Sequence, residues 1–117
     1  MKENIVKNKS FDFVLKTVKL YQFLVNDKNE FVLSKQLLRS GTSIGANVRE
    51  AEQAESKADF IHKTSISLKE ANESEYWIEL LFKADYISEN QFNSITKDLK
   101  EILRLLTSII KTSKNNQ

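Results

Sequence analysis

The sequence predicts an all-α protein, an antiparallel four-helix bundle in up-down-up-down order. The chain has 117 residues, enough for one hydrophobic core, so we expect a single domain over residues 1–117. It contains no proline and only two glycines, whereas an all-β protein needs those residues in its many hairpin turns. Four segments repeat apolar residues at spacings of three and four. The links between them are short, which favours antiparallel packing of neighbouring helices.

The first helix is predicted at about residues 10–27, with Ser10 as its N-cap. Its expected core face consists of Phe11, Val14, Leu15, Val18, Tyr21 and Val25. The second helix is predicted at about residues 30–54, and its core face consists of Leu33, Leu37, Gly41, Ile44, Val48 and Ala51. This phase continues through Gly41 and Gly45. We therefore expect an unbroken helix there, in which small residues let a neighbouring helix approach closely.

The third helix is predicted at about residues 57–86, after a Ser56 N-cap with Asp59 three positions later. Its expected core face consists of Ile61, Thr64, Leu68, Ala71, Ile78 and Phe82. The fourth helix is predicted at about residues 89–113, with a capping box between Ser88 and Gln91. Its core face consists of Phe92, Ile95, Leu99, Ile102, Leu106 and Ile109.

The composition excludes several classes of protein. Charged residues interrupt every apolar stretch, so we expect a soluble chain without a membrane span. The absence of cysteine excludes disulfides, a thiolate nucleophile and cysteine-based metal sites, and it is typical of a reducing compartment. The N-terminal residues lack the apolar region of a signal peptide. The predicted location is the cytoplasm.

No motif predicts catalysis. The pair Gly41 and Gly45 lacks the Lys-Ser/Thr ending of a phosphate-binding loop. His62 is the only histidine, too few for a di-iron site or a hydrolytic triad, and we expect it on a solvated helix surface. Glu75 lies near the apolar stripe of the third helix, where a paired structural carboxylate is favoured over a metal ligand, a subunit contact or acid–base chemistry. We therefore expect a non-enzyme that needs no metal, cofactor or small-molecule substrate.

Apolar residues also occur away from the expected core faces of the first and third helices. They are Phe13, Leu20, Leu24, Ile66, Trp77, Leu81 and Ala84. Scattered surface apolar residues are ordinary, but a single bundle buries only one stripe per helix. We favour a subunit interface formed by Phe13, Leu20, Leu24, Ile66, Trp77 and Leu81, with Trp77 as an aromatic anchor.

Basic residues form stripes on the first and last helices, opposite their apolar faces. The candidate nucleic-acid contacts are Lys16, Lys19, Lys97, Lys100, Arg104, Lys111 and Lys114. A basic stripe is often only a solvated face, and this one lacks the interleaved aromatic residues of single-strand binders. Repeated over an oligomer, however, the stripes would form an extended field able to hold phosphates.

Residues 36–51, QLLRSGTSIGANVREA, resemble the signature of the four-helix-bundle family of the 23S ribosomal RNA intervening-sequence protein. Residues 67–78 resemble the third-helix motif of that family, and residues 85–87 resemble the turn that links its third and fourth helices. Residues 105–112 resemble its last helix, so the resemblance extends over about residues 8–113. The resemblance implies a small bacterial bundle, and several members of the family assemble as homopentamers. It also implies kinship with the accessory protein of diversity-generating retroelements, a pentameric bundle that engages a reverse transcriptase and nucleic acid.

The function expected from residues and resemblance together is a non-catalytic homo-oligomer, most simply a pentamer, that binds RNA or an RNA-handling protein through its basic surface. The alternative is a protein–protein scaffold without a nucleic-acid role. The sequence identifies neither the RNA nor the partner.

Overall fold

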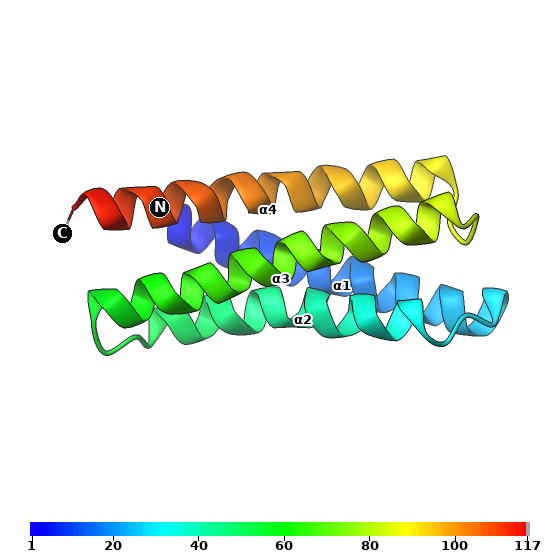
Figure 1. Ribbon diagram of the computed structural model, residues 1–117, viewed down its shortest axis with the longest axis horizontal. Coiled ribbons are helices and arrows are strands. Elements are labelled where there is room, and N and C mark those ends of the chain that lie inside the picture. The colour runs from blue at the N-terminus through cyan, green and yellow to red at the C-terminus, as the bar shows by residue number, and fades with distance from the viewer. Residues whose placement is uncertain (117) are drawn as a thin grey trace.

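The computed structural model describes residues 1–116 as four long helices in one antiparallel bundle (Figure 1). The helices are α1 (Lys2–Lys28), α2 (Leu33–Glu52), α3 (Lys57–Lys83) and α4 (Glu89–Asn115). Each helix packs against the next one along the chain, and α4 closes the bundle against α1. The chain therefore runs up, down, up and down, and both termini lie at the same end of a molecule 48 × 21 × 19 Å in extent.

The predicted core faces of the second and fourth helices are confirmed, except that Leu33 and Phe92, at the start of each face, are only half-buried. Leu37, Ile44 and Val48 of α2 are buried, as are the small residues Gly41 and Ala51. The buried residues of α4 are Ile95, Leu99, Ile102, Leu106 and Ile109. Helix α2 continues without a break through both glycines. Apolar and polar positions are well separated on these two helices, so periodicity alone identifies the buried side.

The predictions for the first helix are wrong in start and in phase. Helix α1 begins at Lys2, and Ser10, predicted as its N-cap, is 1% exposed within it. Phe11 and Leu15, predicted as core, are each 49% exposed. The buried residues are Val6, Ser10, Phe13, Thr17, Leu20 and Leu24. This helix carries two apolar stripes, and the buried one includes small polar residues because α2 approaches closely there.

On the third helix, Thr64, Ala71 and Ile78 are buried as predicted, but the core face is shifted from the other three predicted positions. The buried residues are Thr64, Ser67, Ala71, Ser74, Ile78 and Leu81. The predicted core residues Ile61, Leu68 and Phe82 are half-buried at the edge of this face. Two of the buried positions are serines, which a hydrophobic pattern does not count.

Side chains cap three of the helices. Ser56 accepts a hydrogen bond from Asp59 N, and Ser88 forms the predicted capping box with Gln91. Helix α2 begins three residues later than predicted. Its N-cap position is Val32, whose side chain makes no hydrogen bond, and the carboxylate of Glu30, two residues earlier, accepts from the first N–H groups instead. Glu30 Oε1 accepts from Ser34 N at 2.7 Å, and Oε2 accepts from Leu33 N at 2.9 Å and Val32 N at 3.1 Å. Burial raises the pKa of Glu30, but these backbone donors outweigh it and hold the pKa below its usual value.

Candidate functional site

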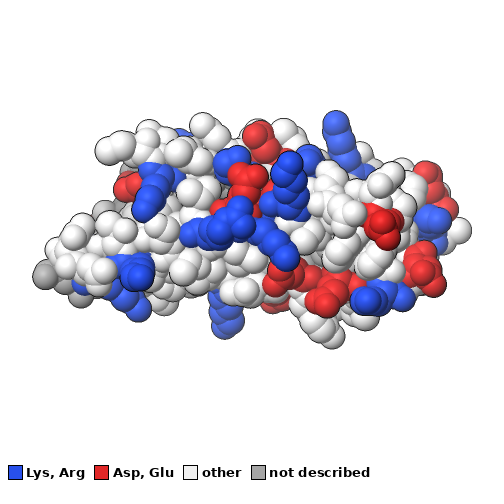
Figure 2. Space-filling model, turned by 90° about the horizontal axis from the view of Figure 1, so that it is seen from above, with Lys and Arg blue, Asp and Glu red and all other residues white. Residues whose placement is uncertain are grey.

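Helix α4 presents a row of cations on its outward side. Lys97, Lys100, Arg104, Lys111 and Lys114, here called the basic ridge, are all exposed. None of the five forms an ion pair within residues 1–116. Figure 2 looks onto the α4 side and shows Lys and Arg gathered near the middle of this face, with Asp and Glu beside them. The ridge is thus a row of exposed cations that an anion can contact, although the charge of Arg104 also helps to lower the pKa of the neighbouring Glu101.

Two acids of α4 lie between the basic ridge and α1, and they neutralise two of the lysines in the basic stripe of α1. Asp98 Oδ2 lies 2.5 Å from Lys16 Nζ, and Glu101 Oε2 lies 2.7 Å from Lys9 Nζ. The hydrogen bond and the opposite charge raise the pKa of Lys9 and lower the pKa of Glu101. Lys19 is exposed and forms no ion pair within the described chain. Of the two α1 lysines predicted to contact nucleic acid, Lys19 is therefore unpaired within the described chain, whereas Lys16 forms an ion pair with Asp98.

An open groove of about 440 Å³ lies between α1 and the first turns of α4, next to these lysines. Its α1 wall consists of Lys16, Lys19, Leu20 and Phe23, and its α4 wall consists of Asn90, Gln91, Ser94 and Ile95. We call it the α1–α4 groove. It combines an apolar floor with a basic and amide-rich rim.

Phe23 is the residue of this groove that sequence reasoning missed. It belongs to neither apolar stripe assigned to the first helix, because it lies on the flank that faces α4. Lys28 Nζ lies 5.8 Å from the centre of its ring, within the range of a cation–π contact. The spacing Lys16, Lys19, Phe23 was the available signal, since residues three and four apart share one side of a helix.

The predicted subunit interface is wrong for four of its six residues. Phe13, Leu24 and Leu81 are 0% exposed and Leu20 is 8% exposed, all within the core of a single chain. They cannot contact another subunit without unfolding the bundle. The other two predicted residues, Ile66 and Trp77, are half-buried, and Ala84 is exposed at the end of α3.

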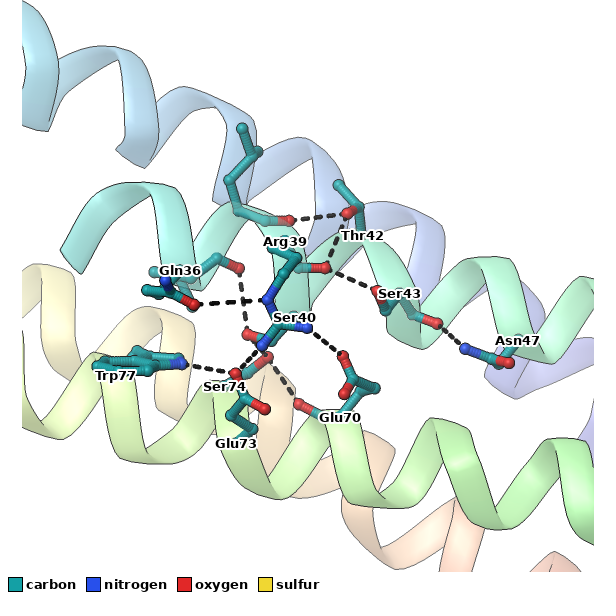
Figure 3. A network of polar contacts seen from close by, with 12 residues as sticks. Gln36, Arg39, Ser40, Thr42, Ser43, Asn47, Glu70, Glu73, Ser74 and Trp77 are labelled. Carbon is teal, nitrogen blue, oxygen red and sulfur yellow. Dashed lines mark hydrogen bonds and ion pairs between the residues drawn. The ribbon is translucent and has the colours of Figure 1, made fainter. Parts of the chain in front are cut away.

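A polar network joins α2 and α3 beside Trp77 (Figure 3). Arg39 Nη1 lies 3.1 Å from Glu70 Oε2, and Arg39 Nη2 pairs with Glu73 Oε2. Trp77 Nε1 donates to the same Glu73 oxygen at 2.9 Å. Gln36 Oε1 accepts from Arg39 Nε at 3.5 Å. The two sequence segments with the strongest family resemblance thus contact each other directly.

Buried serines complete the contact between these helices. Ser40 Oγ lies 2.8 Å from Ser74 Oγ (Figure 3), and Ser67 Oγ donates to the carbonyl oxygen of Ile44 at 2.8 Å. Within residues 1–116, no buried side-chain nitrogen or oxygen lacks a hydrogen-bond partner. Because each hydroxyl has a hydrogen-bond partner, the cost of removing it from water is offset, and small polar residues can occupy core positions. The signature residues of α2 and α3 therefore have a structural role.

The two glycines of α2 face small polar residues of α1. A Cβ atom at Gly41 would lie 3.0 Å from Thr17 Cγ2, closer than nearly all real contacts. A Cβ atom at Gly45 would lie 3.6 Å from Ser10 Oγ, an ordinary van der Waals distance. The close approach of the helices is therefore tightest at Gly41.

The remaining candidates form no reactive cluster in the described part of the chain. His62 is exposed on α3, as predicted for a solvated residue. Glu75 is half-buried and makes no ion pair with any described residue, so the paired carboxylate predicted there is absent from residues 1–116. Over the same residues, no group of three or more His, Cys, Asp or Glu side chains could hold a metal ion. No described helix is long and apolar enough to cross a membrane.

The chain is similar to known proteins in both sequence and structure. A sequence model of the 23S rRNA-intervening sequence protein family matches residues 2–108. A solved structure of a protein with unknown function from the S23 ribosomal protein family of Bacteroides thetaiotaomicron VPI-5482 is 63% identical to this chain, with a TM-score of 0.94. The similarity covers 95% of this chain and 99% of that one. A search of curated proteins found no match. The chain therefore belongs to the 23S rRNA-intervening sequence protein family.

Proposed function

We propose that this chain is a non-catalytic, homo-oligomeric bundle, located in the cytoplasm, that binds RNA through the basic ridge of α4. The observation that carries the proposal is the set of five exposed cations on one side of α4 that form no ion pair within residues 1–116. The family name refers to 23S rRNA, which supports choosing RNA as the polyanion.

Phosphate contacts supply the binding energy in this proposal. Each Lys or Arg that neutralises a phosphate releases a condensed counterion, so affinity falls steeply with salt and depends little on sequence. Lys97, Lys100 and Arg104 occupy successive turns of one helix and can follow a phosphate backbone. Lys9 and Lys16 already have carboxylate partners, so they contribute less.

Self-association belongs to the same proposal, but through a different face from the one predicted. Phe11 and Leu15 are half-exposed on the outward side of α1, beside the half-buried Val14 and Val18. This apolar stripe is not used by the core of the chain, and a second copy would remove it from water. The family resemblance supports a homopentamer. Several copies would repeat the ridge and let individually weak phosphate contacts combine.

A protein partner, either an RNA-handling protein or the client of a scaffold, is the second candidate. Its support is the mixed sign of the charges on the α4 face, where Asp98 and Glu101 lie beside the ridge. A folded protein has no phosphate backbone with condensed counterions, so we expect affinity for such a partner to fall less steeply with salt.

The test is retention of RNA at about 50 mM salt, at which phosphate contacts are strong. The ridge variant carries Lys100→Glu, Arg104→Glu and Lys111→Glu. The control carries Lys35→Glu, Lys69→Glu and Lys83→Glu, three exposed lysines of α2 and α3, so that both variants have the same net charge. The proposal expects retention to fall in the ridge variant and to persist in the control. No salt-sensitive retention by the wild type, or equal loss in both variants, would refute it.

A further inference from the structure

The α1–α4 groove has a chemistry that suits one part of an RNA strand. We propose that it binds an unstacked base of single-stranded RNA, with Phe23 as the stacking surface. This inference rests on the proposed function, because it assigns a second contact to the same bound strand.

The floor of the groove is suited to the flat apolar face of a base. Leu20, Phe23 and Ile95 all line the groove, and the volume of the groove, about 440 Å³, falls in the range of small-molecule sites. Phe23 is half-buried, and the flexible side chain of Lys28, whose Nζ lies 5.8 Å from the ring centre, would have to move aside for a base to stack there. Stacking on an aromatic side chain tolerates any base, since every base has a π face.

The rim of the groove is suited to the polar parts of a nucleotide. Lys19 is unpaired within residues 1–116 and lies at the edge where a phosphate would follow. Lys16 lies beside it, 3.3 Å from Ser94 Oγ, but it is already paired with Asp98. Gln91 uses its Oε1 to accept from Ser88 N at 2.8 Å, which leaves its amide NH₂ able to donate to a base edge. A neutral apolar ligand would use none of these groups.

The groove and the basic ridge can serve one strand. Ser94 lines the groove, and Lys97 of the ridge lies one helical turn further along α4. A strand with its phosphates on the ridge therefore passes the mouth of the groove. In an A-form duplex the bases are stacked and paired, so only a single strand can place a base there. The structure thus assigns the chain a preference for single strands.

The experiment compares Phe23→Leu with Phe31→Leu by fluorescence anisotropy. The probe is a fluorescein-labelled, unstructured 12-nucleotide RNA, alone or annealed to its complement. Phe31 is 58% exposed in the link between α1 and α2, and it belongs to none of the proposed contact surfaces. Leucine keeps an apolar side chain at each position, and circular dichroism verifies that both variants fold.

We expect the wild type to prefer the single strand. We also expect Phe23→Leu to weaken single-strand binding about fivefold or more, the effect of losing one stacked base, while duplex binding is unchanged. Phe31→Leu should bind as the wild type does. In addition, 4-thiouridine placed in the RNA should cross-link to the peptide that contains Phe23.

Equal affinity for single strand and duplex, or a Phe23→Leu variant that binds like the wild type, would overturn the inference. If the ridge variant still loses RNA in that case, only the groove assignment fails, whereas a wild type that binds neither RNA overturns the proposed function too. Binding of poly-glutamate that is weakened by Phe23→Leu, with unchanged RNA binding, would identify an acidic peptide as the occupant instead.

Discussion

Thr17 of α1 lies so close to Gly41 of α2 that an added Cβ atom would be 3.0 Å from its methyl group. The same Thr17 donates its hydroxyl to the carbonyl oxygen of Phe13 at 2.9 Å, which fixes its rotamer. The Thr17 side chain next to Gly41 thus cannot rotate away without losing a buried hydrogen bond.

The first prediction compares the two glycines. Gly41→Ala should destabilise the bundle, and Gly41→Leu more so, by about 1 to 3 kcal/mol of overpacking. Gly45→Ala should instead be neutral or stabilising, because Ala is the better helix former by about 1 kcal/mol and its Cβ meets Ser10 at an ordinary distance. Urea unfolding measures both. Equal effects of alanine at the two positions would show that Thr17 does not crowd Gly41.

The second prediction concerns acid stability and Glu30. Its pKa is lower in the folded state than its ordinary value of 4.5, so its stabilising effect is present above that value and is lost as pH falls through the folded pKa. Glu30→Gln should cost about 1 to 2 kcal/mol at pH 7, the scale of a lost helix cap, and much less near pH 3. Urea titrations at the two pH values measure the difference. The control is Glu79→Gln on the exposed side of α3. A cost of Glu30→Gln that does not change with pH would contradict the assignment.

The third prediction is that the Arg39 network contributes little to stability despite its many contacts. The Arg39 side chain is 50% exposed, and exposed ion pairs are typically worth about 1 kcal/mol or less. Arg39→Ala should therefore lower the free energy of unfolding by about that amount. The single tryptophan reports locally, since Trp77 shares Glu73 with Arg39. We expect a change in its fluorescence with little change in the urea midpoint, and a loss of several kcal/mol would contradict this view.

The fourth prediction tests the outward stripe of α1. Leu15→Glu should weaken self-association, because a charge in an apolar contact is not compensated there. Asn72→Glu on the exposed face of α3 is the control. Light scattering gives the mass of each variant. An oligomer unchanged by Leu15→Glu would exclude this stripe, and a monomeric wild type would exclude self-association altogether.

The parts of the fold that could be predicted are those in which apolarity alone marks the buried side. Ile95, Leu99 and Ile102 of α4 have no competing stripe, and Ser88 with Gln91 marks the start of that helix. On α1 the pattern is ambiguous, because Phe11 and Leu15 compete with Phe13 and Leu20. The structure resolves the ambiguity through close helix packing at small residues, a property of two helices together.

The sequence predicts those features of the candidate site that depend on one helix, but not those that depend on how two helices pack together. Exposure of the basic ridge follows from its position opposite the apolar face of α4. The pairing of Lys16 with Asp98 depends on the lateral offset between α1 and α4, which periodicity does not give. The groove around Phe23 likewise exists only once two helices are placed side by side.

The measurement that tests the central claim most directly is the slope of log affinity against log salt for a single-stranded RNA. The variant for this test carries Lys100→Ala, Arg104→Ala and Lys111→Ala, which removes three ridge charges without adding acids. Each lost phosphate contact should reduce the slope by about 0.7, so we expect the variant to be shallower by about 2 while its mass by light scattering is unchanged. An identical slope in wild type and variant would show that the basic ridge does not contact RNA.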